Sequence, residues 1–281
     1  MAEAAARLGT RWPRRRAFIT GAGSGLGLAL ATQLARAGWT VGRLERDPAR
    51  LADTAAALVA AGGTVHDYTG DVTDESAFAA ALTAFVETTG GLELMINNAG
   101  VAVSGRVETT PLADWRWIFE INVLAVATGS RLALPHLRAA PDGGALVNIA
   151  SAAAFAAPPL MGAYNASKAA VLALTETVAA ELGGSRVTAT AVMPTFFPTR
   201  LLDTARAGAK ELATARRWMS SSRYTAERCA ADLLAGVEKG RVHVALPADS
   251  LWMWRFKRYF PGWFVARLRQ RAGATRRTNR S

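Results

Sequence analysis

The sequence is poor in the residues that form disulfides and metal sites. Its 281 residues include one cysteine, Cys229, and three histidines, His66, His136 and His243, which lie far apart. A single cysteine cannot form a disulfide within the chain, and these four residues lack the close spacing of a zinc site. No secretory signal opens the sequence, so we expect a cytoplasmic protein. The Gly-x-Ser-x-Gly motif of serine hydrolases is absent as well.

Acidic residues are scarce at both ends of the chain, and this scarcity accounts for the net charge of +11. Residues 1–16 carry five arginines and one glutamate, and residues 252–281 carry nine basic residues and no acid. The remaining residues, 17–251, therefore sum to −2. A nucleic-acid groove is normally part of the fold, so we expect no nucleic-acid partner. Basic ends are typical of segments that are solvated or that contact an anionic membrane surface.

Short apolar runs alternate with helical patterns along most of the chain. The predicted strands are residues 17–20, 40–44, 64–68, 92–96, 145–149 and 186–192. The predicted helices are residues 26–37, 48–61, 74–88, 112–137 and 163–182. Such alternation predicts a parallel sheet with helices on both faces, and no linker divides it. We therefore predict one doubly wound, Rossmann-type α/β domain over residues 17–250, between a basic N-terminal extension (1–16) and an aromatic and basic C-terminal tail (251–281).

A glycine-rich turn follows the first predicted strand. From Thr20 to Gly27 it reads Thr-Gly-Ala-Gly-Ser-Gly-Leu-Gly. Glycines let a pyrophosphate approach the backbone, and the start of a helix offers free N–H groups to that anion. The strict Gly-x-Gly-x-x-Gly spacing is absent, so the turn alone is a moderate indication of a nucleotide site, and a plain turn is the alternative.

A tyrosine and a lysine stand four positions apart at the start of the helix predicted at 163–182. Tyr164 and Lys168 therefore share one face of that helix. A tyrosine with its ordinary pKa of about 10 is a poor base at neutral pH, and a nearby ammonium group favours the phenolate. The pair suits proton transfer to or from an alcohol oxygen. A core tyrosine with a satisfied hydroxyl is the alternative.

Together the two motifs resemble the classical short-chain dehydrogenase/reductase family, and further features follow in that family's order between about residues 17 and 245. These are Asp71-Val72, Asn97-Asn98-Ala99-Gly100, Asn122, Ser151 thirteen residues before Tyr164, Pro194 and Thr199. The family usually has Pro-Gly where this chain has Pro194-Thr195, so we expect a restricted backbone beside the nicotinamide.

The resemblance implies an NAD(P)-dependent oxidoreductase that interconverts an alcohol and a carbonyl group, as a homo-dimer or homo-tetramer. It implies that Tyr164 exchanges a proton with the substrate oxygen, that Ser151 hydrogen-bonds this oxygen, and that Lys168 lowers the pKa of Tyr164 and holds the nicotinamide ribose. Asn122 would support a water that links Lys168 to solvent. Besides Tyr164 and Lys168, the implied cofactor-binding residues are Thr20, Gly21, Ser24, Gly25, Leu26, Gly27, Glu45, Arg46, Asp71, Val72, Asn97, Ala99, Gly100, Pro194 and Thr199.

The second predicted strand ends in two residues of opposite charge that bear on the choice of cofactor. Glu45 stands where NAD-preferring relatives have an acid, which accepts hydrogen bonds from the ribose and repels a 2′-phosphate. Arg46 stands where many NADP-preferring relatives have a base. We predict NAD, with NADP as the alternative.

Apolar residues surround the expected substrate cleft. They are Phe155, Pro158, Leu160, Met161, Phe196, Phe197, Trp218 and Met219. We predict that Phe155, Met161 and Phe196 contact the substrate together with Ser151 and Tyr164. Such a lining suits a hydrophobic alcohol or ketone of steroid, retinoid or fatty type, and core packing is the alternative for several of these residues.

Aromatic and basic residues are mixed from Leu251 to Val265. Charges interrupt this segment too often for a membrane-spanning helix, which needs about twenty apolar residues. Aromatic rings beside cations are typical of the membrane interface, so peripheral membrane contact is one prediction. The alternative is a tail that docks on its own subunit or on a partner.

Two other functions remain open from the sequence. A non-catalytic nucleotide-binding regulator of the same fold would bind the cofactor without turnover. A nucleic-acid binder would lose its affinity with the basic tail and would be sensitive to salt. The joint presence of Asn122, Ser151, Tyr164 and Lys168 favours the enzyme.

Overall fold

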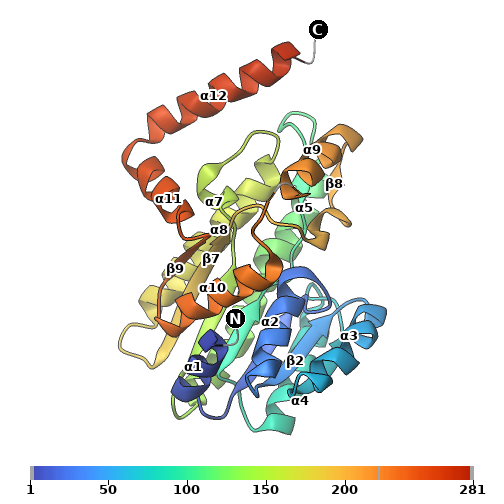
Figure 1. Ribbon diagram of the computed structural model, residues 1–281, viewed down its shortest axis with the longest axis vertical. Coiled ribbons are helices and arrows are strands. Elements are labelled where there is room, and N and C mark those ends of the chain that lie inside the picture. The colour runs from blue at the N-terminus through green and yellow to red at the C-terminus, as the bar shows by residue number, and fades with distance from the viewer. Residues whose placement is uncertain (1–2, 221, 279–281) are drawn as a thin grey trace.

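The computed structural model describes residues 3–220 and 222–278, and at its centre lies a seven-stranded parallel sheet (Figure 1). In order across the sheet, the strands are β3 (Thr64–Thr69), β2 (Thr40–Glu45), β1 (Arg16–Thr20), β4 (Leu94–Asn97), β6 (Gly144–Ile149), β7 (Val187–Pro194) and β9 (His243–Leu246). The strand order reverses between β1 and β4, which leaves a crevice at the carboxyl ends of these strands. The predicted doubly wound, Rossmann-type fold is confirmed.

Helices cover both faces of the sheet and build two core clusters with it. One face is covered by α1 (Glu3–Arg11), α2 (Gly25–Arg36), α3 (Pro48–Ala60) and α10 (Ala226–Glu238). The other is covered by α4 (Glu75–Thr89), α6 (Ala125–Ala139) and α8 (Gly162–Glu181). Strand side chains alternate between the clusters: Ala17 and Ile19 of β1 join the first, and Phe18 joins the second.

Residues 3–16, predicted as a basic extension, are part of this fold. In α1, Ala5 and Leu8 are fully buried, and so is Trp12 directly after it. α1 packs against α10. Arg16 is the first residue of β1, and its guanidinium forms a buried salt bridge with Glu93. The segment therefore contains a helix with one apolar face, although its five arginines suggested an exposed extension.

The long helix predicted over residues 112–137 is interrupted at Asn122. α5 (Leu112–Phe119) passes into a short π-helix, η1 (Glu120–Leu124), before α6 begins. A π turn inserts an extra residue and is frequent at functional sites. Within the described residues, Leu112–Ala139 is also the one helical stretch long and apolar enough to cross a membrane, and 44% of its apolar window is buried inside the protein, as in a core helix.

The remaining elements lie around the carboxyl ends of the strands and after them. They are β5 (Val103–Ser104), α7 (Ala153–Ala156), η2 (Arg200–Leu202), β8 (Arg206–Ala207), α9 (Ala209–Ser220), α11 (Ser250–Tyr259) and α12 (Pro261–Thr278). β5 pairs with β8 in a separate small sheet. Figure 1 shows α11 beside the body near α7 and β9, and α12 extending away from it.

Candidate active site

One cavity of about 380 Å³ lies where the carboxyl ends of five central strands meet. Its wall contains the residue that directly follows each strand: Gly21 after β1, Arg46 after β2, Asn98 after β4, Ala150 after β6 and Thr195 after β7. Open α/β sheets bind their ligands at this position, so the fold itself places the site here.

The turn after β1 has the geometry of a pyrophosphate cradle. Gly21 and Gly25 have φ values of 63° and 53°, which side-chain-bearing residues rarely adopt. α2 begins at Gly25, and its N-cap residue Ser24 makes no side-chain capping hydrogen bond. The first N–H groups of α2 are therefore available to an anion. Gly21, Ser24, Gly25 and Leu26 all line the cavity, so this part of the chain fits the pyrophosphate of a dinucleotide.

Two residues predicted at the cofactor support this turn from behind and do not line the cavity. Thr20 Oγ1 accepts hydrogen bonds from the backbone N–H groups of Asn98 (3.0 Å) and Ala99 (3.1 Å). At Gly27, a β-carbon would lie 2.3 Å from the carbonyl oxygen of Gly21. Glycine at this position thus lets α2 pack closely against the turn.

The two asparagines at the end of β4 have different positions. Asn97 points into the core, where its Nδ2 donates to Asn148 Oδ1 at 2.8 Å. Asn98 lines the cavity, and its Nδ2 donates to the carbonyl oxygens of Thr20 (2.9 Å) and Gly21 (3.0 Å). Of the two, Asn98 therefore borders the cavity, and Asn97, which the resemblance implied at the cofactor, does not.

The loop after β3 and the residues beyond Asn98 form another part of the wall. Asp71, Val72, Ala99 and Gly100, all predicted at the cofactor, line the cavity. Asp71 Oδ1 accepts hydrogen bonds from the N–H (2.9 Å) and the hydroxyl (2.8 Å) of Thr73. This local turn fixes the loop that forms this part of the cavity wall.

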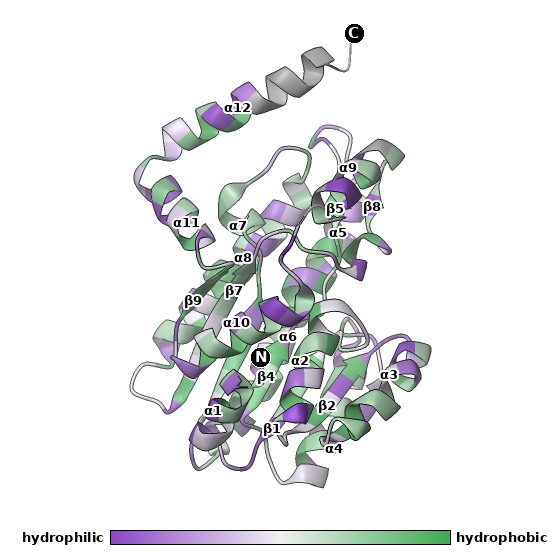
Figure 2. Ribbon diagram, viewed as in Figure 1, coloured by the Kyte–Doolittle hydropathy of each residue, from purple (hydrophilic) through white to green (hydrophobic). Residues whose placement is uncertain are grey.

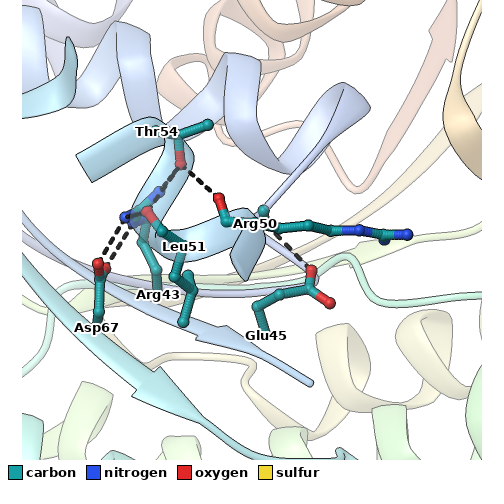
Figure 3. A network of polar contacts seen from close by, with 7 residues as sticks. Arg43, Glu45, Arg50, Leu51, Thr54 and Asp67 are labelled. Atoms are coloured by element: carbon teal, nitrogen blue, oxygen red, sulfur yellow. Dashed lines mark hydrogen bonds and ion pairs between the residues drawn. The ribbon is translucent and has the colours of Figure 1, made fainter. Parts of the chain in front are cut away.

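The end of β2 presents a buried carboxylate to the cavity. Glu45 Oε2 accepts a hydrogen bond from Gly23 N–H (3.2 Å), and Oε1 accepts one from Arg46 N–H (3.1 Å). Arg46 and Arg50 also line the cavity. Figure 3 shows Glu45 and Arg50 together, and a β-carbon on Gly23 would contact both, at 2.9 Å from Glu45 Cγ and 2.8 Å from Arg50 Cβ. This end of the site therefore combines one fixed negative charge with two positive ones.

Behind this end of the site, Arg43 of β2 is fully buried. Its guanidinium donates to both carboxylate oxygens of Asp67 (2.7 Å each), to Thr54 Oγ1 (2.6 Å) and to the carbonyl oxygen of Leu51 (3.1 Å; Figure 3). These bonds tie β2 to β3 and to α3. The pattern of the sequence carries no signal for this network, because its partners are remote in the chain.

Ser151, Tyr164 and Lys168, predicted as catalytic residues, meet in the cavity. Tyr164 and Lys168 come from the first turns of α8, and Ser151 follows β6. The hydroxyl groups of Tyr164 and Ser151 lie within hydrogen-bonding reach of each other. Lys168 Nζ lies 5.9 Å from the centroid of the Tyr164 ring and donates to the carbonyl oxygen of Ile149 at 2.7 Å.

Burial controls the protonation of this group. It raises the pKa of Tyr164, and the hydrogen bond with Ser151 lowers that pKa by less. It also lowers the pKa of Lys168 to about 8. Both shifts favour the neutral form of the side chain. The resemblance implied a lowered pKa for Tyr164, but in this structure burial is the larger influence and the pKa is raised.

Asn122 lies in η1, fully buried and outside the cavity wall. Its Oδ1 accepts from Val101 N–H (2.9 Å), and its Nδ2 donates to the carbonyl oxygen of Val101 (3.0 Å) and to Ser167 Oγ (3.1 Å). A β-carbon on Gly100 would lie 3.1 Å from Asn122 Oδ1 and 3.5 Å from Lys168 Nζ. Asn122 therefore holds the backbone against which Lys168 packs.

The loop after β7 carries the predicted residues Pro194 and Thr199, and both line the cavity. A β-carbon on Gly25 would lie 3.6 Å from Thr199 Cβ, so Thr199 borders the glycine turn. Thr195, where the family usually has glycine, donates its N–H to the carbonyl oxygen of Leu246 at 2.8 Å. Thr195 is outside the set of described residues with positive φ, so the threonine is accommodated without strain from that source.

Most of the predicted substrate residues line the cavity. Ser151, Met161, Tyr164 and Phe196 do, and Phe155 does not. Phe155 belongs to α7 and is buried in the core cluster against which α11 packs. Of the other apolar residues considered, Pro158, Phe197 and Met219 line the cavity, Leu160 does not, and the side chain of Trp218 lies outside the described part of the chain.

Many residues of the wall were not predicted from the sequence. Among them are Arg50, Asn98, Leu201, Leu202 and Met253. Met253 comes from α11 and reaches the cavity only because that helix folds back beside α7. No spacing signal could have identified it. Among the described residues, no group of three or more His, Cys, Asp or Glu could hold a metal ion.

Comparison with known proteins agrees with this geometry. The pattern of the short chain dehydrogenase family matches residues 15–210. A 2-(R)-hydroxypropyl-CoM dehydrogenase from Xanthobacter autotrophicus is 38% identical over 184 residues, which are 64% of this chain and 73% of that protein. An NADP-dependent (R)-specific alcohol dehydrogenase from Lentilactobacillus kefiri is 31% identical over 202 residues, 71% of this chain and 79% of that protein. The crystal structure of a short-chain dehydrogenase/reductase from Burkholderia phymatum in complex with NAD is similar with a TM-score of 0.81 and 32% identity, covering 87% of this chain and 93% of that one.

Proposed function

The chain belongs to the short-chain dehydrogenase family, and from this premise we propose that it interconverts a hydrophobic secondary alcohol and its ketone, with Tyr164 as the acid and base. Membership makes it an NAD(P)-dependent dehydrogenase that acts on CH–OH groups. The observation that carries the proposal is the meeting of the Tyr164 and Ser151 hydroxyls beside Lys168 in one cavity.

The nicotinamide cofactor, when bound, supplies the acceptor or donor of the hydride. The glycine turn would hold its pyrophosphate, and Lys168 Nζ would hold the hydroxyls of its nicotinamide ribose. Thr199 and Pro194 would border the nicotinamide from the loop after β7. Residues of the glycine turn, Lys168, Pro194 and Thr199 all line the cavity, which supports these assignments.

Tyr164 and Ser151 would handle the substrate oxygen. In ketone reduction, Tyr164 Oη gives its proton to the carbonyl oxygen while Ser151 Oγ donates a hydrogen bond to the same atom. In alcohol oxidation, Tyr164 must first lose its own proton to solvent, and its phenolate oxygen then accepts the proton of the alcohol hydroxyl. Burial raises the pKa of Tyr164, which keeps the proton in place for the reduction, and Lys168, with a pKa of about 8, is suited to exchange protons near neutral pH.

The apolar wall supports a hydrophobic substrate. The cavity that contains Ser151 and Tyr164 is also lined by Met161, Phe196, Phe197, Met219 and Met253. An apolar lining with few converging polar groups is typical of sites that bind hydrophobic small molecules. An alcohol or ketone of steroid, retinoid or fatty type fits this description.

Glu45 supports NAD as the preferred cofactor. Its carboxylate is held by backbone N–H groups and still has lone pairs for the adenosine ribose hydroxyls. Its charge would repel a 2′-phosphate. Arg46 and Arg50 support NADP as the alternative, because both line the same part of the cavity. A homo-dimer or homo-tetramer stays a prediction.

The test is formation of reduced cofactor from NAD and from NADP with a panel of hydrophobic secondary alcohols. We expect Tyr164→Phe to lower turnover about 10²- to 10⁴-fold while cofactor binding persists, because the acid and base is lost and the fold is not. Tyr68→Phe is the matched control, since Tyr68 lies on β3 outside the cavity wall. Undiminished turnover in Tyr164→Phe would refute the role of Tyr164. Cofactor binding without turnover of any alcohol would favour the non-catalytic regulator.

A further inference from the structure

Of the two C-terminal helices, α11 packs on the body and α12 extends away from it (Figure 1). Leu251, Met253 and Trp254 of α11 pack against the core cluster that contains Phe155. The Trp254 ring lies 4.6 Å from that of His243 on β9, between centroids. α11 is therefore anchored to the body, and Met253 extends from it into the cavity wall. Whatever the solvent side of these helices binds is held next to the proposed active site.

Four aromatic side chains form a continuous cluster on the solvent side, here called the aromatic cluster: Trp252, Phe256, Phe260 and Trp263. Ring centroids lie 5.2 Å apart for Trp252 and Phe256, 5.1 Å for Phe256 and Phe260, and 5.2 Å for Phe256 and Trp263. Trp252 is 69% exposed, and Phe260 and Trp263 are each 56% exposed. Exposed apolar side chains that touch one another mark an interaction surface more strongly than scattered ones.

Cations accompany the aromatic rings of α11 and α12, and Arg267 contacts a member of the aromatic cluster, Trp263. Residues 252–281 carry nine basic residues and no acid. Arg258 lies 5.7 Å from the Trp254 ring centroid, Lys257 lies 5.8 Å from that of Phe264, and Arg267 lies 5.6 Å from that of Trp263. Figure 2 shows the resulting mixture of hydrophobic and hydrophilic residues along α11 and the adjoining part of α12. This surface therefore suits a partner with an apolar interior for the aromatic rings and negative charges at its surface for the cations.

We propose that α11 and α12 dock on the surface of an anionic lipid bilayer, with the aromatic cluster at the level of the headgroups. Aromatic rings prefer this interfacial region, and the arginines and lysine beside them would meet the lipid phosphates. Because Met253 belongs to the same helix, docking brings the cavity close to the bilayer. Where the proposed function holds, this arrangement supplies the hydrophobic alcohol from the membrane.

A second copy of the chain is a poorer partner for this surface. Two such segments would repel each other, since both are basic without acidic residues. The rest of the chain offers a net charge of only −2 over residues 17–251, whereas an anionic bilayer offers a dense layer of negative charge. Charge complementarity therefore favours the lipid surface.

Sedimentation of the purified full chain with lipid vesicles tests the docking. We expect binding to phosphatidylglycerol mixed with phosphatidylcholine, little binding to phosphatidylcholine alone, and release at about 1 M salt, where charges are screened within about 3 Å. The charge variant Arg255→Gln/Arg258→Gln/Arg269→Gln should lower the affinity on the order of 100-fold. The aromatic variant Trp252→Ala/Phe260→Ala/Trp263→Ala should lower it as well and should abolish any blue shift of tryptophan emission caused by vesicles.

The matched control removes three exposed arginines elsewhere, in Arg36→Gln/Arg116→Gln/Arg138→Gln, and should bind vesicles as the wild type does. Equal loss in this control would show attraction by net charge alone and would overturn the proposal. So would absence of vesicle binding in the wild type, or an aromatic variant whose only change is a smaller mass in size-exclusion chromatography. Turnover of a water-soluble alcohol is measured separately: its absence counts against the proposed function, and vesicle binding still decides the docking.

Discussion

Glu45 Oε2 accepts a hydrogen bond from Gly23 N–H at 3.2 Å, which fixes the carboxylate at the end of β2 against the glycine turn. This contact predicts the effect of removing the charge while keeping the shape. In Glu45→Gln, we expect the ratio of kcat/KM for NADP to that for NAD to rise about tenfold to a hundredfold, because the repulsion of the 2′-phosphate is lost. Initial rates with both cofactors measure this ratio.

Two further variants sharpen the cofactor test. Glu87→Gln removes an exposed carboxylate of α4 outside the cavity wall and should leave the ratio unchanged. Arg46→Ala should lower kcat/KM for NADP more than for NAD, since Arg46 lines the cavity beside Glu45. An unchanged ratio in Glu45→Gln would mean that this carboxylate does not select the cofactor.

Gly100 is the point at which Asn122 and Lys168 approach the backbone of the site. In Gly100→Ala the new β-carbon would lie 3.1 Å from Asn122 Oδ1 and 3.5 Å from Lys168 Nζ, so Asn122 must move by a few tenths of an ångström. We expect kcat to fall roughly tenfold with a small change in the unfolding midpoint, since displacing catalytic groups slightly is costly to the rate. Gly262→Ala is the control, because nothing lies within 4 Å of its added β-carbon. Wild-type kcat in Gly100→Ala would contradict this role of Gly100.

Arg43 predicts a large effect on stability. Arg43→Met removes a fully buried guanidinium and leaves the carboxylate of Asp67, 31% exposed, without its partner. We expect the free energy of unfolding in urea to fall by about 2–3 kcal/mol, somewhat less than for a pair buried on both sides. Arg7→Met breaks surface ion pairs with Glu3 and Glu238 and should cost less than about 1 kcal/mol. If the two variants lose the same stability, the Arg43 network is no stronger than a surface ion pair.

The fold and the centre of the site could be predicted because both depend on local order in the chain. Strands that end in a glycine turn and alternate with helices determine the sheet, and the four-residue spacing of Tyr164 and Lys168 places both on one face of α8. Contacts between remote segments could not be predicted. The motif alone does not show that the Asn97 side chain bonds in the core while Asn98 borders the cavity and bonds to the glycine turn, because these partners are remote in the chain.

The ends of the chain show the same limit. Arginines dominate residues 1–16, yet Leu8 and Trp12 are fully buried against the body. Met253, in a segment predicted as a tail, reaches the cavity wall. Composition indicates which residues of such helices are exposed. It does not indicate which residues are buried, because that depends on the surface of the body against which the helix packs.

Lys168 predicts a pH dependence of cofactor binding. Burial lowers its pKa to about 8, so below this pH Nζ is protonated and can donate to the ribose hydroxyls, and above it the charge is lost. Since the protonated fraction binds better, we expect the apparent Kd for NAD to be constant below pH 8 and to rise as pH increases, by up to about tenfold per unit. Quenching of tryptophan fluorescence by NAD, from about pH 7 to about pH 9, measures this profile.

Three variants show whether Lys168 or another group causes the rise of the apparent Kd for NAD above pH 8. Lys168→Met should bind NAD weakly and without the rise above pH 8, because it has no proton to lose. Lys239→Met, an exposed lysine after α10, should keep the wild-type profile. Tyr164→Phe should keep it too, since burial raises the pKa of Tyr164 above its ordinary value of 10.0 and takes its titration out of the measured range. A rise above pH 8 that persists in Lys168→Met would assign the titration to another group, and loss of the rise in Tyr164→Phe would assign it to the coupled pair.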